Sequence, residues 1–156
     1  MPALKEKIAD FLAQKRIAVA GVSRDPKGSA ANLIYQKLKQ SGYEVFALNP
    51  QADSVEGERC YPDVKSIAQG VDGVVIVTRP EAAERIVREC AEAGVPRVWM
   101  HRSFGAGSVS EAAAQFCAEH NISVIAGACP MMFCPPVDFG HKCMRWILGA
   151  TGKLPK

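Results

Sequence analysis

Five short apolar runs, rich in β-branched residues, constrain the fold of this chain more than any other feature. They lie at 17–22, 45–48, 74–78, 98–100 and 122–126, and none of them alternates apolar with polar residues. Strands of this kind are buried on both faces, which is typical of parallel sheets covered by helices. We therefore expect a sheet of five mainly parallel strands.

The segments between these runs have helical spacing. Two apolar stripes follow the i, i+3, i+4, i+7, i+8 pattern: Ala83, Ile86, Val87, Cys90 and Ala91, then Val109, Ala112, Ala113, Phe116 and Cys117. Further helices are expected at about 4–14, at 29–40 with a left-handed stop at Gly42, and around 141–148. Alternation of strands and helices implies right-handed crossovers, and so an α/β, Rossmann-like, doubly wound sheet with helices on both faces.

Three helix starts are predicted from capping boxes, in which a hydroxyl residue precedes Glu or Gln by three positions. The pairs are Ser66 with Gln69, Thr78 with Glu81, and Ser108 with Glu111. These pairs predict helices that begin just after residues 66, 78 and 108.

Length and composition place the chain in an ordinary class. Its 156 residues are expected to form one domain over 1–156, with a less predictable Cys-, Met- and Pro-rich tail at about 128–156. The charged, helical N-terminus and the absence of any run of about 18 apolar residues predict a cytoplasmic protein without a membrane partner. The formal charge of +3 is too small to predict nucleic-acid binding, although it suits an anionic small ligand.

The loop after the first strand, 21–28, carries the chemistry of a phosphate site. Gly21 permits a tight turn, Ser23 offers a hydroxyl and an amide, and Gly28 leads into a helix whose free N–H groups attract anions. Arg24 and Lys27 add positive charge. A turn with solvated charges would explain the same residues, so the loop alone leaves ligand binding open.

Two observations disfavour NAD(P) as the ligand. The dinucleotide pattern Gly-x-Gly-x-x-Gly would need glycines at 23 and 26, where Ser23 and Pro26 stand. Dinucleotide folds also place an acidic residue at the end of the second strand to hold the ribose. Here that strand ends in Leu48-Asn49-Pro50, which contains no acidic residue.

Several short landmarks occur together and in order along the chain. They are Ala20-Gly21-Val22-Ser23 with Gly28, Leu48-Asn49-Pro50, Cys60-Tyr61-Pro62-Asp63-Val64, Val77-Thr78-Arg79-Pro80, Val98-Trp99-Met100 and Ala128-Cys129-Pro130. From about residue 16 to 131, the chain resembles the small CoA-binding domain family, which is similar to the N-terminal domain of the succinyl-CoA synthetase α subunit.

The resemblance implies a ligand, coenzyme A or an acyl-CoA, and a set of binding residues. It implies that the first loop receives the CoA phosphates, that 49–51 lies along the nucleotide, and that 78–80 borders the ligand. The implied residues are Gly21, Val22, Ser23, Arg24, Lys27, Gly28, Asn49, Pro50, Gln51, Thr78, Arg79 and Pro80. For Thr78, a helix cap with backbone contact to the ligand is favoured over a dedicated side-chain ligand. Asn49 before Pro50 is equally compatible with a simple turn.

No catalytic residue is predicted, and binding without catalysis is the preferred function. One alternative is a small CoA- or nucleotide-dependent enzyme with His101 or Cys129 as its reactive group. A structural, hydrogen-bonded role is nevertheless favoured for His101. Another alternative is a regulatory or interaction module whose tail contacts a partner. A homo-oligomer is also among the alternatives.

The six cysteines are interpreted mainly as packing residues of a reducing compartment. Cys129, Cys134, His141 and Cys143 form a set of soft ligands in the tail, but they lack a Cys-x-x-Cys pair, so no metal site is predicted. A redox role for Cys129 or Cys134, including a mixed disulfide with the CoA thiol, is the more attractive alternative for the tail.

Overall fold

A computed structural model describes residues 2–103 and 107–155. Within these ranges the strands form one sheet in the order β3-β4-β2-β1-β5-β6-β7. All neighbours are parallel except β3 and β4. The strands are β1 (Arg16–Ala20), β2 (Glu44–Leu48), β3 (Ser54–Val55), β4 (Glu58–Tyr61), β5 (Gly73–Ile76), β6 (Arg97–Met100) and β7 (Ser123–Ala126).

The expected α/β, doubly wound architecture is confirmed, but the expected number of strands is wrong. The five apolar runs correspond to β1, β2, β5, β6 and β7. The described chain adds β3 and β4, which form a short hairpin at the sheet edge, with β4 also parallel to β2. Edge strands are often short and polar. Because β4 contains the charged residues Glu58 and Arg59, it has no apolar run that would predict a strand.

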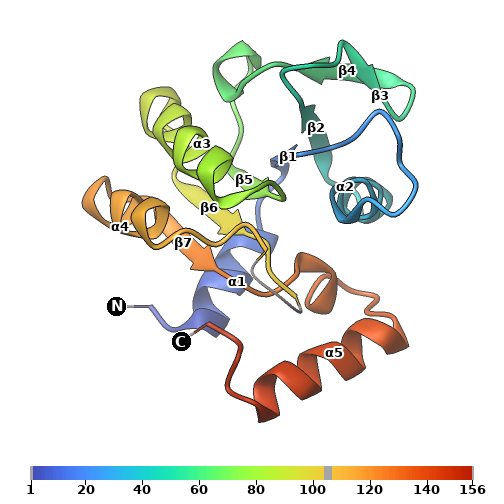
Figure 1. Cartoon of the computed structure of the whole chain (residues 1–156), viewed down its shortest axis with the longest axis vertical. Coiled ribbons are helices and arrows are strands. Elements are labelled where there is room, and N and C mark those ends of the chain that lie inside the picture. The colour runs from blue at the N-terminus through green and yellow to red at the C-terminus, as the bar shows by residue number, and fades with distance from the viewer. Residues whose placement is uncertain (1, 104–106, 156) are drawn as a thin grey trace.

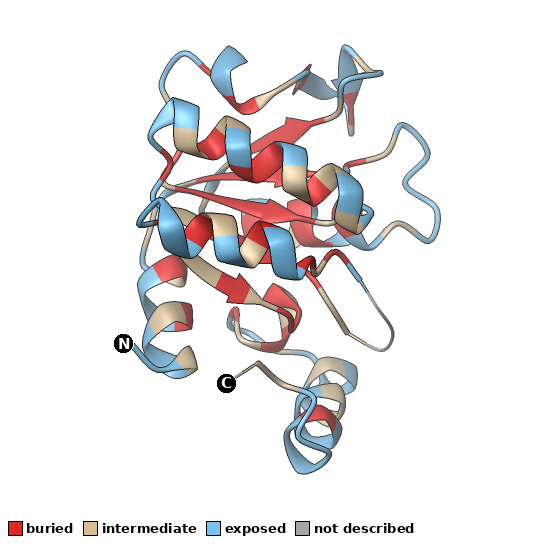
Figure 2. Ribbon diagram, turned by 60° about the vertical axis from the view of Figure 1, so that its left-hand side comes forward, coloured by how far each residue is buried: buried red, intermediate tan, exposed pale blue. Residues whose placement is uncertain are grey.

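Helices cover both faces of the sheet (Figures 1 and 2). One face carries α1 (Leu4–Leu12) and α2 (Ala30–Gln40), and the other carries α3 (Pro80–Ala93) and α4 (Glu111–Glu119). Alternate residues of β1 serve the two cores, because Ile17 and Val19 pack toward α1 and α2 while Ala18 and Ala20 pack toward α3. Cys90 and Cys117 are fully buried, as the helical stripes predicted.

The three predicted capping boxes are wrong. Ser66 ends a short 3-10 helix, η1 (Val64–Ser66), and gives hydrogen bonds to the Asp63 side chain, which caps that turn. The cap residue of α3 is Arg79, without a side-chain bond, and Pro80 starts the helix. The cap of α4 is Ser110, whose hydroxyl accepts the Ala113 N–H at 3.2 Å.

The C-terminal part runs along the face that carries α1 and α2. After β7 the chain forms a 3-10 turn, η2 (Pro130–Met132), and then α5 (Phe139–Ala150) at the periphery of the molecule (Figure 1). Trp99 of β6 is fully buried beneath this segment, where its indole N–H donates to the Gly127 carbonyl at 2.9 Å. No helix in the described part of the chain has the length and apolarity needed to cross a membrane.

Candidate ligand-binding site

The strand order reverses between β1 and β5, and the candidate site lies at this point. The chain leaves β1 toward β2 on one side and later returns to β5 on the other side of β1. In open parallel sheets, ligands bind beyond the carboxyl ends of the strands at such a reversal. Gly21 and Thr78 follow shortly after β1 and β5 at this edge.

Gly21 is required by the close approach of these two chain segments. Its φ is +100°, and a Cβ atom at this position would lie 2.1 Å from the carbonyl oxygen of Val77. Its N–H donates to the Leu48 carbonyl at 3.1 Å, so the turn is also tied to β2. A residue with a side chain cannot occupy this position without displacing the backbone at Val77, just after β5.

A cleft of about 250 Å³ opens beside Gly21. The ends of β1, β2 and β4, the turn at Thr78 and one side of α3 form its walls. Its lining residues are Ala20, Gly21, Leu48, Asn49, Pro50, Gln51, Pro62, Asp63, Thr78, Ala82, Arg85, Ile86 and Glu89. The lining combines apolar walls with a few polar and charged groups, the usual composition of a small-molecule site.

The structure brings together five of the twelve predicted binding residues. Gly21, Asn49, Pro50, Gln51 and Thr78 line the cleft. The other seven do not: Val22, Ser23, Arg24, Lys27, Gly28, Arg79 and Pro80. Val22 is fully buried in the core, whereas the remaining residues lie on the adjoining loop or at the start of α3.

Asn32 of α2 holds the first loop in place. Its amide oxygen accepts the Ser23 N–H at 2.8 Å and its amide nitrogen donates to the Ser23 carbonyl at 2.9 Å. The same nitrogen donates to Glu56 at 2.8 Å. Asn32 is only 2% exposed, so the Ser23 backbone is anchored to the interior and its N–H is already used.

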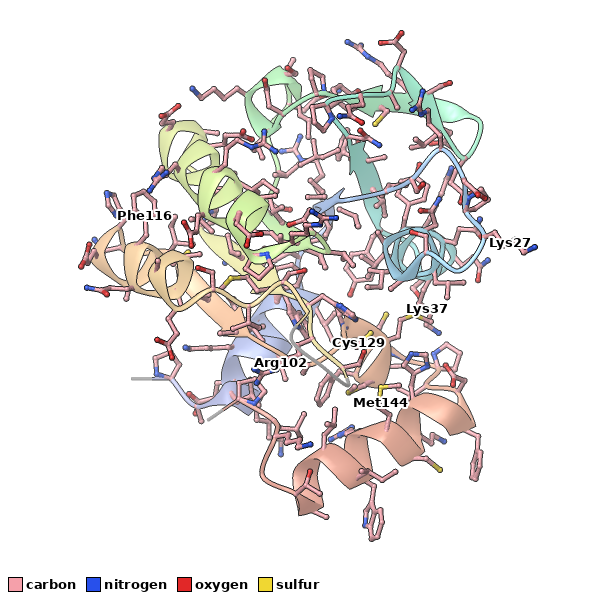
Figure 3. The ribbon with its side chains drawn as sticks, in the orientation of Figure 1. Lys27, Lys37, Arg102, Phe116, Cys129 and Met144 are labelled. Atoms are coloured by element: carbon pink, nitrogen blue, oxygen red, sulfur yellow. The ribbon has the colours of Figure 1, made fainter. Side chains whose placement is uncertain are left out.

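The basic residues of the loop point into solvent. Arg24 and Lys27 are both exposed, and neither has an ion-pair partner in the described chain. Figure 3 shows Lys27 at the outer bend of the loop, directed away from the body of the protein. The Asp25 carboxylate instead accepts the Lys27 backbone N–H at 3.1 Å, and the Asp25 N–H donates to the Ser23 hydroxyl.

Asn49 connects the loops after β1 and β2. Its side-chain nitrogen donates to the Val22 carbonyl at 3.0 Å, and its side-chain oxygen accepts the Gln51 N–H at 2.8 Å. The turn considered for this residue is therefore present, and its binding role stays a prediction. Asn49 lines the cleft and also fixes its shape.

Sequence reasoning missed the wall that α3 contributes. Ala82, Arg85, Ile86 and Glu89 follow the spacing i, i+3, i+4, i+7 and form one side of the cleft. Arg85 and Glu89 form an ion pair at 3.1 Å. Burial raises the pKa of the Glu89 carboxyl, while Arg85 and a hydrogen bond from the Val64 backbone lower it less strongly. The spacing was visible in the sequence, but an i, i+4 ion pair usually marks a solvated helix face.

His101 and Cys129, the two candidate reactive groups, are both buried. His101 is 8% exposed, and burial lowers its pKa, with a smaller contribution from nearby His141. Cys129 is 4% exposed, and burial raises the pKa of its thiol to about 11. Neither residue lines the cleft. A thiol with this pKa is protonated near neutral pH and is a poor nucleophile.

Other groups in the tail form local contacts. Asp138 caps α5 by accepting the His141 N–H at 3.0 Å, and its other oxygen lies 2.6 Å from the His141 ring nitrogen Nδ1. Cys134 lies 3.6 Å from the Ser41 hydroxyl. Over the described residues, His, Cys, Asp and Glu side chains do not assemble into a group that could hold a metal ion.

Comparison with known proteins identifies relatives of this arrangement. The family model described as the CoA binding domain matches residues 15–135. The uncharacterized protein YneT of Bacillus subtilis is 29% identical over 126 residues, which cover 80% of this chain and 90% of YneT. An ADP-forming acetate–CoA ligase of Archaeoglobus fulgidus is 30% identical over 90 residues. That segment covers 56% of this chain but only 13% of the ligase.

Solved structures share the fold. A hypothetical protein from Pyrococcus horikoshii superposes with a TM-score of 0.75 at 26% identity. The superposition covers 83% of this chain and 88% of the archaeal chain. The likeness therefore extends over most of both proteins.

Proposed function

The chain belongs to the CoA-binding domain family, and from this membership we propose that it binds coenzyme A, or an acyl-CoA, at the cleft beside Gly21 without catalysing a reaction. The cleft is the single observation that carries the proposal. It lies at the reversal of strand order, and it adjoins a loop with the charge that a polyphosphate needs.

The size of the cleft favours one part of the ligand. Sites that enclose a drug-sized ligand have volumes of roughly 300–1,000 Å³. The cleft, at about 250 Å³, fits a flat heterocycle such as adenine, and Leu48, Ile86 and Pro50 provide apolar surface for it. The remaining length of CoA would then lie along the carboxyl edge of the sheet.

The phosphates would lie at the loop 22–28 and the start of α2. Arg24 and Lys27 supply positive charge, and the first N–H groups of α2 point toward the same loop. Because Asp25 occupies the Lys27 N–H, phosphate binding would require the loop to exchange this internal bond for a bond to the ligand.

The states of His101 and Cys129 support binding without catalysis. Both are buried outside the cleft, and the Cys129 thiol is protonated near neutral pH. An enzyme that used either group would have to expose it first.

Calorimetric titration with CoA, dephospho-CoA and NAD tests the ligand. We expect CoA to bind most tightly, and dephospho-CoA more weakly because it lacks one phosphate. Each tenfold difference in affinity corresponds to about 1.4 kcal/mol. Binding of NAD in the absence of CoA binding would contradict the proposal.

Filling the cleft tests the site. The substitution Ala82→Trp places an indole on the wall of α3, and we expect it to weaken CoA binding by at least about tenfold while the thermal midpoint changes little. The matched control is Ala112→Trp, because Ala112 is an exposed alanine of α4 that does not line the cleft. Equal affinities of the two variants would place the ligand elsewhere.

A further inference from the structure

A two-residue turn, Glu56 and Gly57, connects β3 to β4 at the edge of the sheet. Val55 pairs with Glu58 across this turn, and its two residues have positive φ, +52° and +75°. Positive φ at both positions is typical of a type I′ turn, in which Asn-Gly is a preferred sequence. Glycine tolerates such a φ, whereas a glutamate is strained by its Cβ atom. The hairpin therefore carries a conformationally unfavourable residue at its tip.

The Glu56 carboxylate connects this turn to α2. Its Oε1 accepts a hydrogen bond from the Asn32 side chain at 2.8 Å, and its Oε2 accepts one from the Gln36 side chain at 2.6 Å. Asn32 and Gln36 are four positions apart, so they lie on the same side of the helix. Strained backbone persists where surrounding contacts compensate for it, and these two bonds are contacts of that kind.

Asn32 continues this contact to the first loop, which lies with the hairpin beside α2 (Figure 1). One hydrogen of its side-chain nitrogen is bound by the Ser23 carbonyl and the other by Glu56, while its oxygen accepts the Ser23 N–H. Asn32 is 2% exposed. Without the carboxylate, one amide hydrogen of a buried residue loses its partner, and the side chain is no longer held against Ser23.

A second glutamate of the hairpin also bonds α2, but through other partners. Glu58 accepts a hydrogen bond from the Tyr35 hydroxyl at 3.1 Å and forms an ion pair with Lys39. In the part of the chain that the structure describes, neither Tyr35 nor Lys39 bonds the loop 22–28. The hairpin is therefore attached to α2 by two glutamates, and only the contact of Glu56 continues to Ser23.

The charge of Glu56 is unfavourable for the proposed ligand. The carboxylate is separated from the Ser23 backbone by a single side chain, that of Asn32, and its negative charge would repel a phosphate in the loop. Attraction of the ligand is therefore ruled out as its role. What the carboxylate supplies is geometric, namely two acceptor oxygens at a fixed distance from α2.

We propose that Glu56 is a positioning residue for the first loop, and that through Asn32 it holds the Ser23 backbone in the form that receives the CoA phosphates. The ligand in this inference rests on the proposed function, whereas the bonded chain from Glu56 to Ser23 does not. A loop that is ordered in advance strengthens binding, because less conformational freedom is lost when the ligand arrives. A positioning residue changes affinity without a matching change in stability.

Two neutral amides of different length separate the contact from the charge. Glu56→Gln removes the charge but keeps the length and an acceptor oxygen, so we expect calorimetry to give a CoA affinity within about twofold of the wild type. Glu56→Asn is one methylene shorter and suits the type I′ turn, so its thermal midpoint should stay the same or rise. It should nevertheless bind CoA at least about fivefold more weakly than Glu56→Gln. Equal affinities of these two variants would overturn the proposal.

Hydrogen exchange of the Ser23 amide, followed by NMR without ligand, tests the connection itself. We expect this amide to exchange at least about threefold faster in Glu56→Asn than in Glu56→Gln. Glu58→Ala is the matched control, because it loosens the same hairpin from α2 through Tyr35 and Lys39. It should change neither the Ser23 exchange nor the CoA affinity. Loss of Ser23 protection in Glu58→Ala would assign the effect to hairpin attachment in general and overturn the role of Glu56.

The two measurements distinguish failure of this inference from failure of the proposed function. If the wild type did not bind CoA, the proposed ligand would be rejected, and the Ser23 exchange would still decide whether Glu56 positions the loop. If CoA bound but the exchange were the same in Glu56→Asn and Glu56→Gln, the positioning role would be rejected alone. Glu56→Gly, which also suits a positive φ, is a second short variant and should behave as Glu56→Asn does.

Discussion

The Ser108 hydroxyl bridges the backbone of Thr78 at the edge of the cleft. It accepts the Thr78 N–H at 2.8 Å and donates to the Thr78 carbonyl at 2.6 Å. Ser108 is 2% exposed. The turn after β5 is therefore fixed by a side chain from the loop that precedes α4.

Replacing Ser108 by alanine should destabilise the protein and disturb the cleft. The substitution leaves a backbone N–H and a carbonyl without their partner, and each buried unsatisfied group costs about 1–3 kcal/mol. We expect a loss of about 2 kcal/mol in urea unfolding and weaker CoA binding. Ser41→Ala is the control, because that hydroxyl bonds the Lys37 carbonyl on an exposed helix end.

Two glycines of the first loop should differ sharply in their tolerance of alanine. At Gly21 a Cβ would collide with the Val77 carbonyl, so we expect Gly21→Ala to cost about 4 kcal/mol or more. At Gly28 φ is +72° but no atom lies within 4 Å of the added Cβ. Gly28→Ala should cost only about 1–2 kcal/mol of left-handed strain. If urea unfolding showed equal losses of stability for the two variants, the close contact between Gly21 and the Val77 carbonyl would not account for the cost at Gly21.

Asp72 should make stability depend on pH in the acid range. Its carboxylate accepts the N–H groups of Arg16 at 2.9 Å and Lys15 at 3.2 Å. These bonds, that from Arg16 foremost, lower the pKa of Asp72 below its ordinary value in spite of partial burial. The unfolded chain then binds the proton more readily than the folded chain.

The sign of this effect follows from the lowered pKa. The stabilisation is present above the ordinary carboxyl pKa of about 3.9 and is lost as pH falls through the lower, folded value. Asp72→Asn should therefore be less stable than the wild type at pH 7, and the difference should shrink below about pH 4. Urea unfolding across this range is the measurement, with Asp53→Asn at an exposed site as the control. A difference that does not change with pH would contradict the assignment.

Cys129 should be dispensable for ligand binding. The substitution Cys129→Ala removes a buried sulfur outside the cleft, so a moderate loss of stability is expected, of about 1 kcal/mol. The CoA affinity should stay within about twofold of the wild type. In the folded protein near neutral pH, iodoacetamide should leave Cys129 unmodified because its pKa is about 11. Rapid alkylation, or loss of CoA binding, would instead support the alternative in which Cys129 is the reactive group of an enzyme.

The sequence predicted most of the fold because burial leaves a direct mark on composition. β1 and β5 are flanked by other strands and covered by helices, so their residues are almost all apolar. β4 lies near the sheet edge, and its Glu58 and Arg59 face solvent. A strand of that composition differs little from a loop until its neighbour is known.

Caps and cleft walls were harder to predict because one residue type can serve several partners. Ser108 and Ser110 both precede α4, and only the tertiary position of Thr78 decides that Ser108 bonds it while Ser110 caps the helix. Arg85 and Glu89 likewise look like a solvated ion pair until β2 and β4 are placed opposite α3. Such choices depend on contacts between residues far apart in the chain.

Asp25 should oppose the binding of CoA, although it lies in the loop proposed to hold phosphate. Its carboxylate accepts the Lys27 N–H at 3.1 Å, and so occupies a donor that an anionic ligand could use. It also places a negative charge between Arg24 and Lys27. That charge would repel the negative charges of a phosphate group. We therefore expect Asp25→Asn to tighten CoA binding.

The charge and the hydrogen bond of Asp25 can be separated by calorimetry at two salt concentrations. The neutral amide keeps a weaker acceptor for the Lys27 N–H, so the gain should be about threefold to tenfold at low salt. It should shrink as salt screens the exposed loop. Lys27→Ala should act in the opposite direction, and Lys5→Ala on α1 is the control for net charge. Weaker CoA binding by Asp25→Asn would contradict this prediction. It would mean that the ligand binds the loop while the Asp25 carboxylate still accepts the Lys27 N–H.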